Sequence, residues 1–181
     1  MTQKFFFLIL TISIAAISCK RSDQNTVSQI ENGAEQKTVA GALTLTELYS
    51  AAENEVGKPV SVQGVVNHVC MHSGKRCFII DSISGNSIRI EARGNIGGFN
   101  KELVGAEILV RGVLREKRLD NSYIDEWEKK TLEEKEAAES DKSHCNADLE
   151  NIVQMRNWMK EHNKPYYSVY FIDGNDYSII E

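Results

Sequence analysis

The chain contains the segment Val56-Gly57-Lys58-Pro59-Val60-Ser61-Val62-Gln63-Gly64-Val65-Val66 and, 48 residues further on, the related segment Val104-Gly105-Ala106-Glu107-Ile108-Leu109-Val110-Arg111-Gly112-Val113-Leu114. Both copies alternate apolar residues with other residues at a period of two, which is typical of β-strands. Each copy also carries a glycine, Gly64 or Gly112, at a position where a strand can bend sharply. Two bent strands of the same design predict a small barrel.

Further short runs supply the other strands of this barrel. They are residues 77–81, 87–92 and 167–172, with a turn expected at 173–176 and a final strand at 177–180. One helical turn near residues 97–103 precedes the second copy of the repeated segment. Three strands, a short helix and a returning strand resemble the OB-fold, a five-stranded Greek-key barrel.

Helices are expected on both sides of the repeated segments. Thr44 and Glu47 have the spacing of a capping box, so a short helix is predicted to run from Leu45 to about Glu55. Residues 122–163 are predicted to form a helical insertion, whose second helix starts at Asn146. The predicted fold is therefore mainly β with a helical insertion (α+β): an OB-like five-stranded barrel with helices between the fourth and fifth strands.

The N-terminal residues have the features of a lipoprotein signal peptide. An uncharged apolar run over residues 5–17 is too short to span a bilayer, and it leads into Ala16-Ile17-Ser18-Cys19, which resembles the lipobox of bacterial lipoproteins. An ordinary secretory peptide with an incidental Cys19 is the alternative. The predicted organisation is a signal peptide at 1–18, a lipidated Cys19, a flexible tether at 19–41 and an OB-like domain at 42–181.

The composition bears on which partners and activities are expected. The chain has 21 Lys and Arg against 26 Asp and Glu, a net charge of −5 at pH 7. Because a protein that binds nucleic acid must neutralise phosphates with a basic surface, we expect no nucleic-acid partner. The sequence shows no Ser/His/Asp constellation, phosphate loop or HExxH motif, so a binding protein is expected rather than an enzyme.

Cysteine and histidine residues are concentrated in the segment His68-Val69-Cys70-Met71-His72-Ser73-Gly74-Lys75-Arg76-Cys77. Alternation along a strand predicts that Cys70 and His72 share a face, and a two-residue turn at Ser73-Gly74 predicts that Cys77 lies opposite Cys70. With Cys19 lipidated, Cys145 remains as an odd thiol. Three thiolates and one imidazole form a tetrahedral zinc set, so the predicted ligands of one metal ion, with zinc as the expected cofactor, are Cys70, His72, Cys77 and Cys145.

Two other interpretations of the same cysteines remain open. Cys70 and Cys77 could form a cross-strand disulfide, since an exported protein folds in an oxidising compartment, or they could be plain buried thiols. A disulfide that cycles would make the chain a thiol/disulfide redox protein in which Cys145 resolves the bond. Neither Cys70 nor Cys77 begins a predicted helix, which is the usual way to lower the pKa of a reactive thiol.

The lipobox, the repeated strand and the hairpin Val69-Cys70-x-His72-x-Gly74-Lys75-x-Cys77-Phe78 together resemble a group of uncharacterised Gram-negative lipoproteins with an OB-like domain. The resemblance covers most of residues 42–181 and implies a lipid-anchored protein of the cell envelope, at the outer membrane. The expected function is a membrane-anchored binding module whose Cys/His hairpin holds zinc. A scaffold that binds an envelope protein or a glycan is a further alternative.

Overall fold

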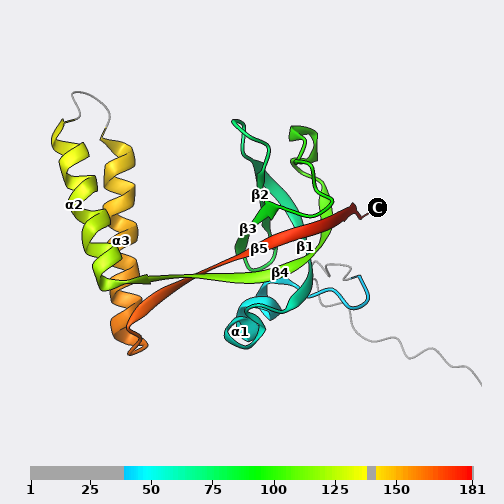
Figure 1. Cartoon of the computed structure of the whole chain (residues 1–181), viewed down its shortest axis with the longest axis horizontal. Helices are drawn as coiled ribbons and strands as arrows, with labels where there is room; N and C mark the ends of the chain where they lie inside the picture. Colours follow the sequence, from blue (N-terminus) through cyan, green and yellow to red (C-terminus); the bar gives the residue numbers. More distant parts are fainter. Residues whose placement is uncertain (1–38, 138–141, 181) are drawn as a thin grey trace, which may run out of the picture. The chain divides into compact units, whose positions relative to one another are not determined.

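The computed structural model describes residues 39–137 and 142–180. Its elements follow the order α1 (Leu45–Glu55), β1 (Pro59–Val69), β2 (Arg76–Ile80), β3 (Ser87–Ala92), the 3-10 turn η1 (Lys101–Leu103), β4 (Glu107–Asp120), α2 (Asn121–Ala137), α3 (Ser143–Glu161) and β5 (Tyr166–Ile179) (Figure 1). The predicted signal peptide, Cys19 and most of the predicted tether lie outside the described residues.

The five strands form a closed barrel in the order β1-β2-β3-β5-β4. The two repeated segments are paired with each other: β1 runs antiparallel to β4, with Val62 opposite Val110. The barrel closes through β5, which runs parallel to β3 and antiparallel to β4. The predicted OB-like barrel with helices between its fourth and fifth strands is therefore confirmed.

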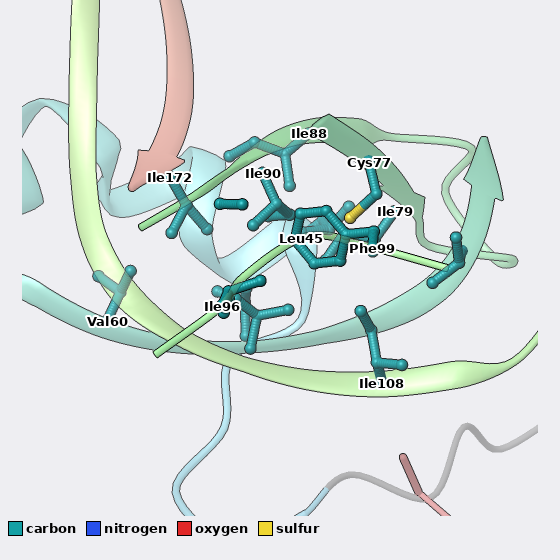
Figure 2. Close-up of a cluster of buried hydrophobic side chains, with 14 of the residues drawn as sticks. Leu45, Val60, Cys77, Ile79, Ile88, Ile90, Ile96, Phe99, Ile108 and Ile172 are labelled. Atoms are coloured by element: carbon teal, nitrogen blue, oxygen red, sulfur yellow. The ribbon is translucent and has the colours of Figure 1, made fainter. Parts of the chain in front are cut away.

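A single hydrophobic core fills the barrel. Side chains that alternate along the strands point inward, including fully buried Ile79, Ile90 and Ile108. Figure 2 shows these side chains meeting Phe99, which lies just before η1, and Leu45 from α1. Because every strand contributes to one cluster, burial of apolar surface holds the sheet closed.

Helix α1 completes this core, and its start is the predicted capping box. The Thr44 hydroxyl accepts a hydrogen bond from the Glu47 backbone N–H at 3.2 Å, and the Glu47 carboxylate accepts one from the Thr44 N–H at 2.8 Å. Leu45, Leu48 and Ala52 form its buried face. These contacts confirm the predicted helix and both of its ends.

The helical insertion has a hydrophobic cluster of its own. Strands β4 and β5 continue beyond the barrel as a two-stranded ribbon that ends at the pair Asp120 and Tyr166, from which α2 and α3 extend. The buried members of this second cluster are Leu119, Ile124, Ile152 and Met159. The insertion begins one residue before its predicted start, and α3 begins at Ser143 rather than at Asn146.

The predicted turn at residues 173–176 and the separate last strand are wrong. Strand β5 runs without interruption from Tyr166 to Ile179. Gly174 pairs with Gly112 and Asp176 pairs with Arg111, so Asn175 is an extra residue in a β-bulge. Small and polar residues suit a bulge as well as a turn, and the pairing along all of β4 favours the bulge.

Candidate functional site

The connection between β1 and β2 holds the predicted cysteine/histidine cluster, in a register that differs from the predicted one. Strand β1 ends at Val69, and Val69, not Cys70, lies opposite Cys77. The ladder shifts between Val66 and His68, so Asn67 is an extra residue on β1. The predicted two-residue turn at Ser73-Gly74 is wrong, because residues 70–75 form a longer connection. Cys70 therefore lies outside the ladder, and the prediction that it faces Cys77 is wrong as well.

Cys70 lies at the start of a tight turn and is partly exposed. Its backbone oxygen accepts a hydrogen bond from the Gly74 N–H at 2.9 Å, which closes the turn. The His72 backbone N–H and then the Ser73 hydroxyl, at 3.9 Å, donate hydrogen bonds to the sulfur and hold the pKa of Cys70 below its ordinary value. The turn therefore favours the thiolate, with the exposed His72 two residues away.

Cys77 and Cys145 lie in other surroundings. The Cys77 side chain points into the barrel core (Figure 2), where burial raises the pKa of its thiol to about 12. Cys145 is buried near the start of α3, at the end of the helical hairpin away from the strands (Figure 1). Cys70, Cys77 and Cys145 are all free thiols in this structure.

The structure thus brings Cys70 and His72 onto one turn and places the other two predicted ligands elsewhere. Within residues 39–137 and 142–180, no group of three or more His, Cys, Asp or Glu side chains is placed to hold a metal ion. Zinc binding by Cys70, His72, Cys77 and Cys145, and a disulfide between Cys70 and Cys77, both stay predictions.

A second candidate site is a cleft of about 390 Å³ between α1, α3 and β5. We call it the aromatic cleft. It is lined by four aromatic and four polar side chains: Tyr49, Trp158, Tyr167 and Tyr170, and Ser50, Glu53, Asn54 and Ser168. Its volume lies within the roughly 300–1,000 Å³ of typical small-molecule sites. The four aromatic side chains are all half-buried, so the fold leaves part of each ring accessible.

The rings of the aromatic cleft are held at steep angles to one another. Tyr49 and Tyr170 meet edge to face, with centroids 6.2 Å apart and planes at 63°, and Trp158 and Tyr167 do so at 5.2 Å and 80°. The Tyr49 hydroxyl donates a hydrogen bond of 2.6 Å to the Ser87 carbonyl, which ties α1 to β3. Burial, and then the neighbouring Tyr167, raise the pKa of Tyr49 to about 12, so its hydroxyl stays protonated.

Two carboxylates are paired with cations here: Glu53, which lines the aromatic cleft, and Glu116, which is hydrogen-bonded to the lining residue Ser168. Glu53 on α1 lies 2.8 Å from the Lys164 amine, which follows α3, and this pair lowers the pKa of Glu53. Glu116 on β4 accepts hydrogen bonds from the Ser168 hydroxyl at 2.6 Å and from Arg118 at 2.9 Å. The cleft is therefore a polar, aromatic site whose charges are neutralised by its own neighbours.

Sequence reasoning did not find the aromatic cleft. Tyr167 and Tyr170 lie in a run that has the pattern of an ordinary strand, and Tyr49 lies beside the apolar stripe of α1 without breaking its pattern. Tyr49 and Trp158 are more than a hundred residues apart in the chain. They line one cleft because the C-terminal end of α3 lies near α1, and no local motif carries that information.

The fold defines the class of protein: a closed OB-like five-stranded barrel with a helical hairpin inserted between β4 and β5. No protein-family model and no curated protein matches the chain. Among solved structures, one similar chain is a DUF3299 family protein from Pseudomonas aeruginosa, with 8% sequence identity and a TM-score of 0.36, over 71% of this chain and 64% of that one. This chain thus spans less than two thirds of that protein's length. In the part of the chain that the structure describes, no helix is long and apolar enough to cross a membrane.

Proposed function

We propose that this chain is a membrane-anchored binding module of the cell envelope, in which the OB-like barrel and its helical hairpin hold a ligand in the aromatic cleft. The observation that carries the proposal is the set of four half-buried aromatic rings around a space of about 390 Å³. Concave sites lined by aromatic groups and a few polar groups are typical ligand sites.

Trp158 supplies a direct test, because the chain has two tryptophans and the other one, Trp127, lies outside the cleft lining. The full-length Trp127→Phe variant therefore reports on the cleft through the emission of Trp158. We expect this emission to shift when an envelope extract, separated into glycan, peptide and lipid fractions, is added. The proposal is wrong if no fraction changes it while circular dichroism shows a folded protein.

The membrane anchor rests on the lipobox-like run that ends at Cys19. The several acyl chains of a lipoprotein cysteine hold a protein firmly to a membrane, whereas one chain binds marginally. We expect the wild-type protein to incorporate an alkyne fatty acid and to sediment with the outer membrane, and Cys19→Ala to do neither. Wild-type protein that is unlabelled and soluble would contradict the anchor.

Zinc binding at the β1–β2 turn is a second candidate function, favoured by the lowered pKa of Cys70 and by His72 on the same turn. Equilibrium dialysis of the reduced full-length protein against zinc tests it. We expect one bound ion, lost in Cys70→Ser and His72→Ala, kept in His68→Ala, and weakened as pH falls because protons compete for the ligands. Wild type that binds no ion would contradict this function.

A further inference from the structure

We propose that the ligand of the aromatic cleft is an uncharged saccharide. This inference rests on the binding function proposed above and names the class of ligand. Three features of the cleft support an uncharged saccharide: the paired charges, the available hydrogen-bonding groups and the arrangement of the rings.

The charges around the aromatic cleft argue against an ionic ligand. Glu53 is paired with Lys164, and Glu116 is paired with Arg118. An anionic ligand would have to displace a carboxylate from its cation, and a cationic ligand would have to displace Lys164 or Arg118. Each pair has a solvent-exposed member, so exchanging one ion pair for another brings a charged ligand little net gain. An uncharged ligand leaves both pairs in place.

Polar groups without a partner line the same space. The Asn54 amide, the Trp158 indole N–H and the Tyr167 hydroxyl make no hydrogen bond to any residue that the structure describes, and none of them is a buried unpaired atom. They come from α1, α3 and β5, so they surround the cleft from different elements. Together they offer donors and acceptors to a ligand that carries hydroxyl groups.

The rings of the aromatic cleft also suit a saccharide. A pyranose has apolar C–H groups on its faces and hydroxyl groups around its rim, so it suits a site in which aromatic surface alternates with hydrogen-bonding groups. Tyr49 and Tyr170 meet at a steep angle, as do Trp158 and Tyr167, and the His162 ring stacks on Trp158 beside them. A purely apolar ligand would leave the Asn54 amide and the Tyr167 hydroxyl unpaired on binding, which is unfavourable.

The test uses disaccharides that differ in charge, added to the full-length Trp127→Phe protein. The neutral probes are chitobiose and maltose, the anionic probe is digalacturonate, and the cationic probe is the glucosamine dimer under conditions in which its amines are protonated. We expect at least one neutral probe to shift the Trp158 emission with higher affinity than either charged probe. Equal or tighter binding of a charged probe, or no binding of a neutral one, would overturn the inference.

Two variants locate the binding. Asn54→Ala and Tyr167→Phe each remove one hydrogen-bonding group, and each is expected to weaken binding of the neutral disaccharide about fivefold. Asn151→Ala, which removes an exposed amide from α3 outside the cleft lining, is the matched control and is expected to change nothing. If Asn54→Ala and Tyr167→Phe both bind as wild type does, the saccharide lies elsewhere and the inference fails.

Failure of the saccharide inference can be distinguished from failure of the proposed binding function. A Trp158 shift that appears with the peptide or lipid fraction of an envelope extract, and with no saccharide, keeps the binding function and overturns the saccharide. No shift with any fraction overturns both.

Discussion

Gly112 on β4 lies opposite Gly174, beside the bulge in β5. A Cβ atom at this position would lie 2.3 Å from the Asp173 carbonyl oxygen and 2.6 Å from Cγ2 of Ile172. The first of these contacts is with backbone, which cannot rotate away. The glycine of the second repeated segment is thus required by packing against the bulge in β5.

We therefore expect Gly112→Ala to lower the free energy of unfolding by about 2 kcal/mol, the scale of overpacking in a close-packed core. Gly97→Ala is the control, since a Cβ there meets no atom within 4 Å. Urea denaturation followed by circular dichroism measures both. Equal stability of the two variants would show that the bulge can move aside.

The thiols of Cys70 and Cys77 are expected to differ in reactivity. The thiolate is the nucleophile, and its share at neutral pH rises as the pKa falls. Cys70, whose pKa is lowered by the His72 N–H and the Ser73 hydroxyl, should react with iodoacetamide in the folded protein, and its rate should level off at a lower pH than in the unfolded chain. Cys77 should react after unfolding.

Mass spectrometry of the digested protein identifies which cysteine carries the iodoacetamide label. Ser73→Ala removes one donor to the Cys70 sulfur and should move the rate profile of Cys70 toward higher pH. Labelling of Cys77 as fast as Cys70 under native conditions would contradict its place in the core.

At the scale of the element, α1 is stabilised at its start by the capping box. Replacing Thr44 by Ala removes the hydroxyl that accepts from the Glu47 N–H. Loss of an N-cap side chain costs about 1 kcal/mol, so Thr44→Ala should lower the melting temperature by about 3 °C. Calorimetry of wild type and variant measures the difference, and an unchanged melting temperature would mean that core packing alone holds α1.

The same capping box makes a pH-dependent contribution to the stability of the folded protein. The Thr44 backbone N–H, and then its hydroxyl, lower the pKa of Glu47 in the folded protein. A carboxyl whose folded pKa is lowered stabilises the fold above its unfolded pKa, and this contribution is lost as pH falls through the folded pKa. Glu47→Gln should therefore flatten the acid side of the stability profile, whereas Glu126→Gln, at an exposed carboxylate on α2, should leave it unchanged. The same profile in all three proteins would contradict the assignment.

At the scale of the whole molecule, the barrel and the helical hairpin have separate hydrophobic clusters. Asp120 and Tyr166 are paired across the antiparallel ribbon, so a two-residue turn can join them. Replacing residues 121–165 by Asn-Gly should leave the barrel folded and remove Trp158 from the aromatic cleft. Without the hairpin, Leu119 and Val169 would be exposed to solvent, so the shortened protein also carries Leu119→Thr and Val169→Thr.

Methyl NMR of the barrel isoleucines, such as Ile79, Ile90 and Ile108, checks this prediction. Their dispersed shifts should persist, while binding of a neutral disaccharide should be lost. Collapse of these shifts to those of an unfolded chain would show that the barrel depends on the helical hairpin.

Short-range patterns and the repeat carry the features of this fold that can be predicted from the amino-acid sequence. The capping box joins residues three apart, so Thr44 and Glu47 reveal it directly. Period-two alternation in both repeated segments indicated two like strands, and Val62 does pair with Val110. The change from strand to helical pattern after β4 indicated the insertion.

The tertiary structure decided the register and the aromatic cleft. The extra residue Asn67 in β1 changes which side chain faces Cys77, and a bulge is stabilised by the partner strand rather than by its own sequence. In the same way, Asn175 is accommodated as a bulge, so residues 173–176 continue β5 although their sequence is typical of a turn. The aromatic cleft contains both Tyr49 and Trp158 because the ribbon of β4 and β5 holds the C-terminal end of α3 near α1, an arrangement that exists once distant strands have paired.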